Sequence, residues 1–183
     1  MTRAVFIDRD GTLIKDKVET VRPGDLEFLP GADSLALLKA AGFLLIVITN
    51  QSGIGKGHYS EKDMQLFHSH MLKGARDIGV EIDGIYFCPH TKEDGCSCRK
   101  PLPGMLLKAA SDFDIDLGGS YLIGDQNRDA LAGINAGVKK NYIVTTGIYP
   151  DGIYVPDPLL GSSAEICTNL REAVLRIVEN VNF

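Results

Sequence analysis

Short apolar runs that no polar residue interrupts alternate along this chain with longer amphipathic stretches. A run without polar alternation is typical of a strand buried on both faces, as in a parallel sheet. The predicted strands are Ala4–Ile7, Phe43–Ile48, Ile85–Phe87, Tyr121–Ile123 and Tyr142–Val144. The predicted helices are roughly Asp33–Ala41, Ser60–Asp77, Pro103–Asp112, Arg128–Ala136 and Asn169–Glu179. This β-α-β order predicts an α/β fold, with a doubly wound parallel sheet and helices on both of its faces.

The length of 183 residues suits one well-packed domain, and neither a repeat nor a linker divides the sequence, so we predict a single domain over residues 1–183. The formal net charge of −5 at pH 7 argues against a nucleic-acid partner, because tracking a phosphate backbone needs spread positive charge. The longest apolar run is too short to span a bilayer, and the N-terminus lacks the pattern of a signal peptide. The cysteines are clustered rather than evenly spaced, which is unlike a disulfide framework. We therefore expect a cytoplasmic protein without a membrane partner, acting as a monomer.

Polar residues follow three of the predicted strands at their C-terminal ends. They are Asp8-Arg9-Asp10, then Thr49-Asn50-Gln51-Ser52, and then Gly124-Asp125. In an open parallel sheet these ends share one edge, and ligands bind there. Residues more than a hundred positions apart are therefore expected to converge on one site.

Two carboxylates, Asp8 and Asp10, stand just beyond the first predicted strand, and Gly11 allows a sharp turn there. Taken alone, this pattern also fits a strand that ends in a polar turn. A third carboxylate at another strand end, Asp125, favours a site instead. Carboxylates brought close together raise one another's pKa unless a cation lies among them, and a hard cation such as Mg²⁺ prefers oxygen ligands. The sequence therefore predicts a magnesium site formed by carboxylates at the strand ends.

Features suited to an anion lie near the same edge. The segment Thr49–Ser52 leads into Gly53–Gly57 and offers a hydroxyl and several unencumbered backbone amides to phosphate oxygens. Arg99 and Lys100 place two cations ahead of a predicted helix, Lys100 as a point charge and Arg99 as a fork for two oxygens. A flexible loop and a solvated surface pair are the plainer interpretations of these two features. Jointly they predict phosphate binding by Thr49, Asn50, Gln51, Ser52, Arg99 and Lys100.

Three cysteines and one histidine are bunched together, as Cys88-Pro89-His90 and Cys96-Ser97-Cys98. Zinc favours four tetrahedral ligands of these types, and a closed set of three cysteines and one histidine is typical of a structural site. Scattered core cysteines or a redox pair are the alternatives, but the charged residues and the glycine at 92–95 indicate an exposed loop. We predict a zinc loop over about residues 88–98, formed by Cys88, His90, Cys96 and Cys98, that fixes the position of the two cations after it.

Three further residues of metal-binding type are not assigned to a metal site. His68 and His70 lie two apart on the predicted helix Ser60–Asp77, so they do not share a face and are interpreted as incidental. Cys167 lies in a late apolar stretch and is predicted to be buried. The start of the same helix, Ser60 with Asp63, has the spacing of a capping box.

Taken together, the motifs resemble those of the haloacid dehalogenase (HAD) superfamily, over roughly residues 4 to 147. The resemblance rests on Asp8-x-Asp10-Gly-Thr, the strand-ending Thr49-Asn50, Lys100, and Gly124-Asp125 with Asp129. It implies a Rossmann-like HAD fold in which Asp8 is the nucleophile and forms an aspartyl-phosphate. Asp10 would protonate the leaving oxygen and then activate water, while Thr49 and Lys100 would bind the phosphoryl group. Magnesium would be held by Asp8, the Asp10 backbone carbonyl and Asp125, with Asp129 supporting them.

Within the superfamily, the zinc loop joined to Arg99-Lys100-Pro101 is similar to that of D-glycero-D-manno-heptose 1,7-bisphosphate 7-phosphatases and of the related histidinol-phosphate phosphatases. This resemblance implies hydrolysis of a small phosphorylated sugar, with a catalytic Mg²⁺ and a structural Zn²⁺. Such families commonly carry a Gly-Tyr pair after the first motif, in a segment that contacts substrate, whereas this chain has Lys15–Arg22 without that pair. The intervals between the motifs leave no room for a large cap domain, so an open site is expected.

The leading hypothesis is hydrolysis of the 7-phosphate of a heptose bisphosphate. A histidinol-phosphate phosphatase, a nucleic-acid 3′-end phosphatase and a non-catalytic phosphate-binding module are the alternatives. The acidic balance of the chain disfavours the nucleic-acid enzyme. The presence of both Asp8 and Asp10 disfavours the binding module, because binding phosphate alone favours fewer negative charges.

Overall fold

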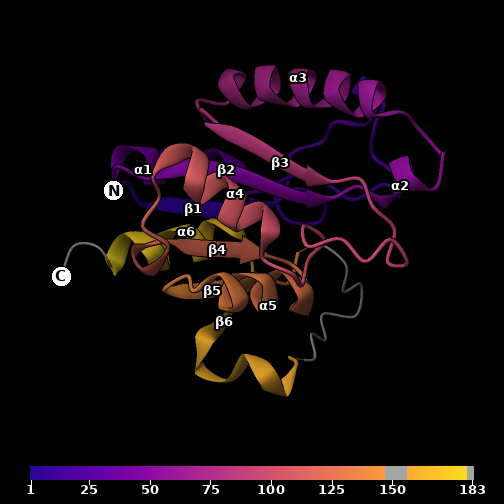
Figure 1. Ribbon diagram of the computed structural model, residues 1–183. Coiled ribbons are helices and arrows are strands. Elements are labelled where there is room, and N and C mark those ends of the chain that lie inside the picture. The colour runs from indigo at the N-terminus through magenta and orange to yellow at the C-terminus, as the bar shows by residue number, and fades with distance from the viewer. Residues whose placement is uncertain (147–155, 181–183) are drawn as a thin grey trace.

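The computed structural model describes residues 1–146 and 156–180, and its centre is a parallel sheet (Figure 1). The strands are β1 (Ala4–Asp8), β2 (Leu44–Asn50), β3 (Gly84–Cys88), β4 (Tyr121–Gly124), β5 (Lys140–Val144) and β6 (Ala164–Cys167). Their order across the sheet is β3-β2-β1-β4-β5-β6. The order runs outward from β1 in both directions, so the connections reverse between β1 and β4. At such a reversal an open α/β sheet forms a crevice beyond the carboxyl ends of its strands.

Helices cover both faces of the sheet, as the doubly wound prediction requires. They are α1 (Leu35–Ala40), α2 (Ser52–Gly55), α3 (Glu61–Asp77), α4 (Gly104–Phe113), α5 (Asn127–Ala136) and α6 (Leu170–Glu179). Short 3₁₀ turns are η1 (Pro23–Asp25), η2 (Ala32–Ser34), η3 (Leu117–Gly119) and η4 (Pro158–Ser163). Side chains of α1, α3 and α6 pack on one face and those of α4 and α5 on the other. Figure 1 shows α4 and α5 in front of the sheet and α6 behind it.

Alternate residues of the central strands supply the two cores. In β1, Val5 and Ile7 face the core beneath α1, α3 and α6, whereas Ala4 and Phe6 face the core beneath α4 and α5. Burial on both faces explains why this strand is an unbroken apolar run in the sequence. Each fully buried large apolar side chain contributes about 1.5–3 kcal/mol to folding. The end of β1 is therefore a rigid support for the polar residues that follow it.

The predicted strands and helices are all present, with ends that differ by no more than two residues, but β6 and α2 were missed. As an edge strand, β6 carries the charged Glu165 and the half-exposed Ile166, so it lacks a continuous apolar run. The helix α2 spans only four residues of a glycine-rich segment, which is too short for a helical period. Cys167 is buried, as predicted.

The capping box predicted at the start of α3 is confirmed. The Asp63 amide donates to Ser60 Oγ at 3.2 Å, and the Ser60 amide donates to Asp63 Oδ2 at 2.9 Å. These bonds satisfy two amides that the first turn of a helix leaves free, and such a cap is worth about 1 kcal/mol. The cap fixes where α3 begins and hence which of its residues face the sheet.

The carboxyl edge of the sheet is left open by the connections around it. Between β1 and β2 the chain forms only η1, η2 and α1, and between β2 and β3 only α2 and α3. Within residues 1–146 and 156–180 no cap domain covers this edge, as expected.

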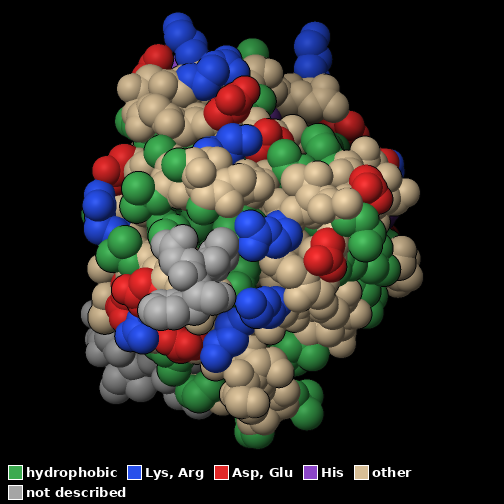
Figure 2. Space-filling model, turned by 90° about the vertical axis from the view of Figure 1, so that its left-hand side faces the viewer, with side chains coloured by type: hydrophobic (Ala, Val, Ile, Leu, Met, Phe, Trp, Pro, Cys, Tyr) green, Lys and Arg blue, Asp and Glu red, His purple; other side chains and the backbone are tan. Residues whose placement is uncertain are grey.

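No helix in the same part of the chain is long and apolar enough to cross a bilayer. Figure 2 shows the opposite end of the molecule, where both Lys and Arg and Asp and Glu side chains lie on the surface.

Candidate active site

Three buried carboxylates meet at the crevice between β1 and β4. Asp8 is the last residue of β1, Asp125 directly follows β4, and Asp129 lies in the first turn of α5. One oxygen from each lies within 4.8 Å of the others, and all three side chains are buried. The strand ends that were predicted to converge therefore do so.

Lys100 joins this cluster from a distant part of the chain. Its Nζ lies 2.6 Å from Asp8 Oδ1 and 2.7 Å from Asp129 Oδ1, and it donates to the Ile48 carbonyl at 3.1 Å. Burial alone would lower the pKa of Lys100, but the carboxylates of Asp129 and Asp8 raise it above its ordinary value. Lys100 is therefore a fixed positive charge beside the end of β1.

One ammonium group does not balance three carboxylates. Burial raises the pKa of Asp8 to about 6, against the lowering effect of Lys100. Burial, followed by the charges of Asp8 and Asp129, raises the pKa of Asp125 to about 9. Both carboxylate oxygens of Asp125 are buried without a hydrogen-bond donor. A hard divalent cation satisfies such oxygens and favours their ionised form, so the residues present fit a magnesium ion.

The turn after Asp8 brings the backbone against this cluster. Gly11 has a φ of +86°, and a Cβ built on it would lie 2.4 Å from Asp125 Oδ2. Both the left-handed conformation and the missing side chain are therefore needed at this position. This is the sharp turn that the sequence predicted, and its close approach to Asp125 joins the first and last motifs.

Asp10 lies outside the three-carboxylate cluster and has its own partners. Its Oδ2 accepts from Arg9 Nε at 2.9 Å and from Gln51 Nε2 at 3.0 Å, and its Oδ1 accepts from Arg9 Nη2 at 3.0 Å. Gln51 Nε2 also donates to Thr49 Oγ1 at 2.8 Å, and the Tyr59 hydroxyl donates to Gln51 Oε1 at 2.7 Å. The amide of Gln51 is therefore held with its nitrogen toward Asp10, which leaves Asp10 a well-fixed carboxylate beside the cluster.

A pocket with a volume of about 240 Å³ opens over Asp8 and Asp10. Its lining includes all of the predicted phosphate-binding residues except Arg99, namely Thr49, Asn50, Gln51, Ser52 and Lys100. Lys56 and Arg128 also line it, and the sequence patterns had given neither a role. The pocket thus combines the carboxylates of Asp8 and Asp10 with hydroxyl groups and several cations, a set suited to a phosphate ester.

Two more of the predicted phosphate-binding residues, Asn50 and Arg99, also make hydrogen bonds within the protein. Asn50 Oδ1 accepts from the Lys100 amide at 3.0 Å, and Asn50 Nδ2 donates to the Lys100 carbonyl at 3.2 Å. Arg99 Nη1 donates to the His90 carbonyl at 3.2 Å, and Arg99 lines a separate hollow of about 330 Å³ beside the cysteine loop. In this structure Asn50 therefore fixes the backbone of Lys100, and contact of Arg99 with phosphate stays a prediction.

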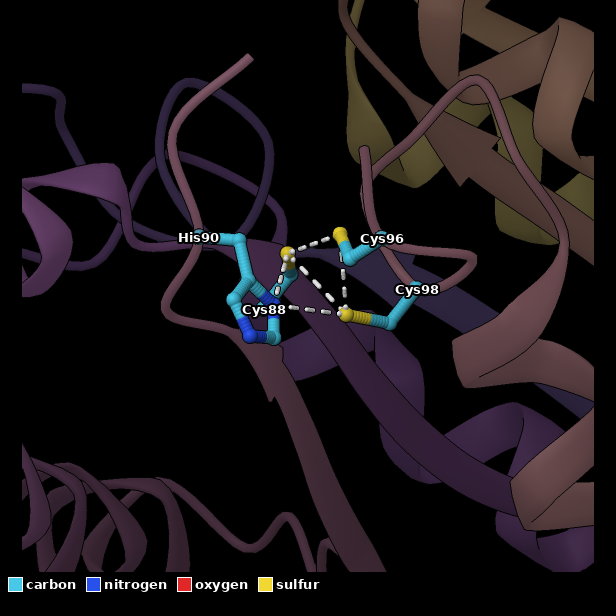
Figure 3. Close-up of side chains that lie close together, drawn as sticks. All are labelled: Cys88, His90, Cys96 and Cys98. Carbon is cyan, nitrogen blue, oxygen red and sulfur yellow. Dashed lines mark hydrogen bonds between the residues drawn. The ribbon is translucent and has the colours of Figure 1, made fainter. Parts of the chain in front are cut away.

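The cysteine loop brings its four predicted ligands together (Figure 3). Cys88 ends β3, His90 follows it, and Cys96 and Cys98 return from the far side of the loop. The sulfur–sulfur distances are 3.1–3.6 Å and His90 Nδ1 lies 3.3 Å from Cys98 Sγ, with no disulfide among them. Ligands placed tetrahedrally about 2.3 Å from a zinc ion are about 3.8 Å apart, so a small expansion fits that ion. Burial raises the pKa of the Cys88 thiol, a cost that a bound cation would offset.

The interpretation of His68 as incidental was wrong. His68 is buried on α3, and its Nε2 lies 3.0 Å from Arg9 Nη1. The helical spacing from Met64 to His68 to Met71 places it on the buried face, a signal that was present in the sequence. The buried Arg9 and the half-buried Tyr59 were missed for another reason, since neither the residue type nor its position in the sequence indicates these contacts. His70 is exposed and has no part in the site.

The chain is similar to known proteins over nearly its whole length. A family model described as HAD-hydrolase-like matches residues 97–173. The D-glycero-beta-D-manno-heptose-1,7-bisphosphate 7-phosphatase of Pasteurella multocida (strain Pm70) is 41% identical over 175 residues, covering 91% of this chain and 95% of that protein. The protein of the same name from Escherichia coli (strain K12) is 38% identical over 173 residues, covering 89% and 91%. The crystal structure of D,D-heptose 1,7-bisphosphate phosphatase from B. bronchiseptica, complexed with magnesium and phosphate, has a TM-score of 0.84 at 31% identity and covers 97% of this chain and 99% of that one.

Proposed function

This chain belongs to the HAD-superfamily family of D-glycero-beta-D-manno-heptose-1,7-bisphosphate 7-phosphatases, and we propose that it hydrolyses the 7-phosphate of that bisphosphate in a magnesium-dependent reaction. As a member it is a phosphoric monoester hydrolase. The observation that carries the proposal is the cluster of Asp8, Asp125 and Asp129 around Lys100, in which both oxygens of Asp125 lack a donor. A divalent cation would offset the charge of this cluster, which presents one carboxylate, Asp8, to the pocket.

In the first step, an oxygen of the Asp8 carboxylate attacks the phosphorus of the ester. A bond from phosphorus to Asp8 forms while the bond from phosphorus to the sugar oxygen breaks. Asp10, entering this step protonated, gives its proton to the leaving oxygen, so that the sugar departs as a neutral alcohol. Thr49 Oγ1 and Lys100 Nζ bind the phosphoryl oxygens and stabilise the charge that develops on them.

In the second step, Asp10 acts as the base. It takes a proton from a water molecule whose oxygen attacks phosphorus, and the bond between phosphorus and Asp8 breaks. Inorganic phosphate leaves, and both carboxyl groups return to their starting states. Dividing one displacement into two in this way replaces a difficult attack by water on the ester with two easier steps.

Two metal ions belong to the proposal. Asp8, Asp125 and the Asp10 carbonyl would hold Mg²⁺, with Asp129 beside them, and a bound ion would offset charge on the phosphoryl oxygens. Cys88, His90, Cys96 and Cys98 would hold Zn²⁺ in a structural role. The single domain over residues 1–183, the monomeric state and the cytoplasmic location stay predictions.

A phosphate-release panel tests the substrate. It contains both anomers of the heptose 1,7-bisphosphate, histidinol phosphate and a DNA 3′-phosphate, each with Mg²⁺ and with a chelator. We expect the β anomer to have the highest kcat/KM and the chelator to abolish release. A higher kcat/KM for histidinol phosphate or the DNA 3′-phosphate would move the chain to that alternative, and phosphate binding without release from any ester would indicate a binding module.

Replacing Cys96 with Ser tests the zinc loop. We expect loss of bound zinc, a fall of more than about 2 kcal/mol in the free energy of unfolding, and a lower kcat, because the loop leads directly to Lys100. Metal analysis, urea denaturation and phosphate release measure the three effects. The matched control is Ser97→Ala, an exposed position in the same loop, which should match wild type in all three. Full zinc content and full activity in Cys96→Ser would reject the zinc role.

A further inference from the structure

Arg9 is the largest of the fully buried side chains, with 1% of its surface exposed. It lies in the sequence between the two aspartates of the proposed mechanism, Asp8 and Asp10. Its guanidinium group makes four hydrogen bonds. Nε and Nη2 donate to the two oxygens of Asp10, Nη2 also donates to the Thr20 carbonyl at 3.0 Å, and Nη1 lies 3.0 Å from His68 Nε2. These bonds use four of its five N–H donors. Arg9 also lines the pocket, but with one N–H donor left over it has little capacity to bind a substrate phosphate.

The partner on α3 fixes one side of this arrangement. A guanidinium group only donates, so Nε2 of His68 must accept and the imidazole must be neutral. The guanidinium carbon also lies 5.1 Å from the centre of the Phe67 ring, a favourable contact for a cation. Arg9 thus packs against two residues of α3, the helix that covers this side of the core.

The partner on the other side is the segment that lines the pocket. Thr20 is buried, and its Oγ1 accepts from the Lys17 amide at 3.1 Å. Between these two residues, Val18 and Glu19 have φ values of 54° and 61°, which residues other than glycine rarely adopt. Glu19 is paired with His58, which precedes α3. The segment is therefore held in an unfavourable conformation by contacts at its ends, and Arg9 makes one of those contacts.

We propose that Arg9 is a positioning residue, which fixes the carboxylate of Asp10 for proton transfer and couples it to the pocket-lining segment at Thr20. The inference rests on the proposed role of Asp10 as acid and base. Two parallel hydrogen bonds from one planar group define the plane of the Asp10 carboxylate, and Gln51 adds a third bond from a different direction. Arg9 Nη2 donates both to Asp10 and to the Thr20 carbonyl. A displacement of the pocket-lining segment at Thr20 would therefore move the rigid guanidinium group and with it the carboxylate of Asp10.

The test compares leaving groups, because only some esters need a proton from Asp10. In p-nitrophenyl phosphate the leaving phenolate departs without protonation, whereas the sugar alkoxide of the heptose bisphosphate does not. We expect Arg9→Met to lower kcat for the sugar ester by about 100-fold. Transfer of the first phosphoryl group from p-nitrophenyl phosphate should slow by less than about 5-fold, so a burst of p-nitrophenolate close to one equivalent precedes a slow steady state. Arg9→Lys, which keeps the charge but not the fork, should lie between Arg9→Met and wild type and serves if the first variant folds poorly.

Three comparisons make the outcome decisive. Asp10→Asn should show the same dependence on the leaving group, more strongly. Lys39→Met removes another partly buried ion pair, 2.7 Å from Asp83 at the amino end of β3, and should leave the ratio between the two esters unchanged. Equal losses on both esters in Arg9→Met and Arg9→Lys, or the same change of ratio in Lys39→Met, would overturn the positioning role. Turnover retained by Asp8→Asn would instead remove the proposed function itself.

Discussion

Asp8→Asn is expected to lower kcat for the heptose bisphosphate by on the order of 10⁴-fold or more, while the protein stays folded. The amide has nearly the same shape as the carboxylate but is a very poor nucleophile, so the bond from phosphorus to residue 8 does not form. Removing one charge from a crowded acidic cluster also relieves repulsion, since Asp8 itself contributes to the raised pKa of Asp125. Lys100 loses the charge of Asp8 but keeps its ion pair with Asp129, so stability is expected to hold or to rise slightly.

Two measurements check this expectation. Phosphate release gives the loss of turnover, and mass spectrometry of acid-quenched enzyme locates phosphate on the peptide that contains Asp8 in wild type only. Asp114→Asn is the matched control, since its side chain is largely exposed and its left-handed backbone is one that asparagine tolerates. A phosphorylated peptide lacking residue 8, or normal turnover in Asp8→Asn, would refute the covalent mechanism.

Lys100→Met is expected to impair both stability and chemistry. Its ammonium group is the positive partner of Asp8 and Asp129, and breaking such a buried pair costs about 3–5 kcal/mol. In the proposed mechanism Lys100 also stabilises the phosphoryl group, so its loss should lower kcat by on the order of 10²–10³-fold. Since Mg²⁺ would neutralise the same carboxylates, adding it should restore part of the stability and little of the activity.

Urea denaturation with and without Mg²⁺ separates the two effects of this substitution. The control is Lys108→Met, which removes an exposed pair with Asp112 four residues away on α4. It should change the free energy of unfolding by no more than about 0.5 kcal/mol and leave kcat alone. If Lys100→Met proved as stable as wild type without metal, the carboxylates would not depend on that lysine.

The parts of the site that could be predicted are those that lie at strand ends. Asp8 and Asp125 each follow an unbroken apolar run, and parallel strands bring such ends to one edge whatever the intervening sequence. The four proposed zinc ligands lie within eleven consecutive residues, so their spacing in the sequence was enough to predict the cluster. Cys88 could be predicted as a ligand without knowledge of the sheet, although it is the last residue of β3.

The parts that could not be predicted depend on contacts between elements. Arg9 reads as an exposed charge beside an aspartate, and its burial follows from His68, 59 positions away. The direction of the Gln51 amide is set by Tyr59, whose own position depends on the turn after α2. Likewise β6 exists because β5 offers it a free edge, which no property of the segment 164–167 announces.

The side-chain amide of Asn50 hydrogen-bonds the backbone of Lys100, not its side chain. The position of the Lys100 ammonium group therefore does not depend on the length of the tip of the cysteine loop. One end of the loop is anchored at Cys88 in the sheet, and the other is reset at the peptide of Lys100 by two hydrogen bonds from β2. Insertions or deletions at the exposed tip, residues 92–95, are then absorbed between two fixed points. A change in the length of this tip is therefore expected to leave the ammonium group of Lys100 beside Asp8.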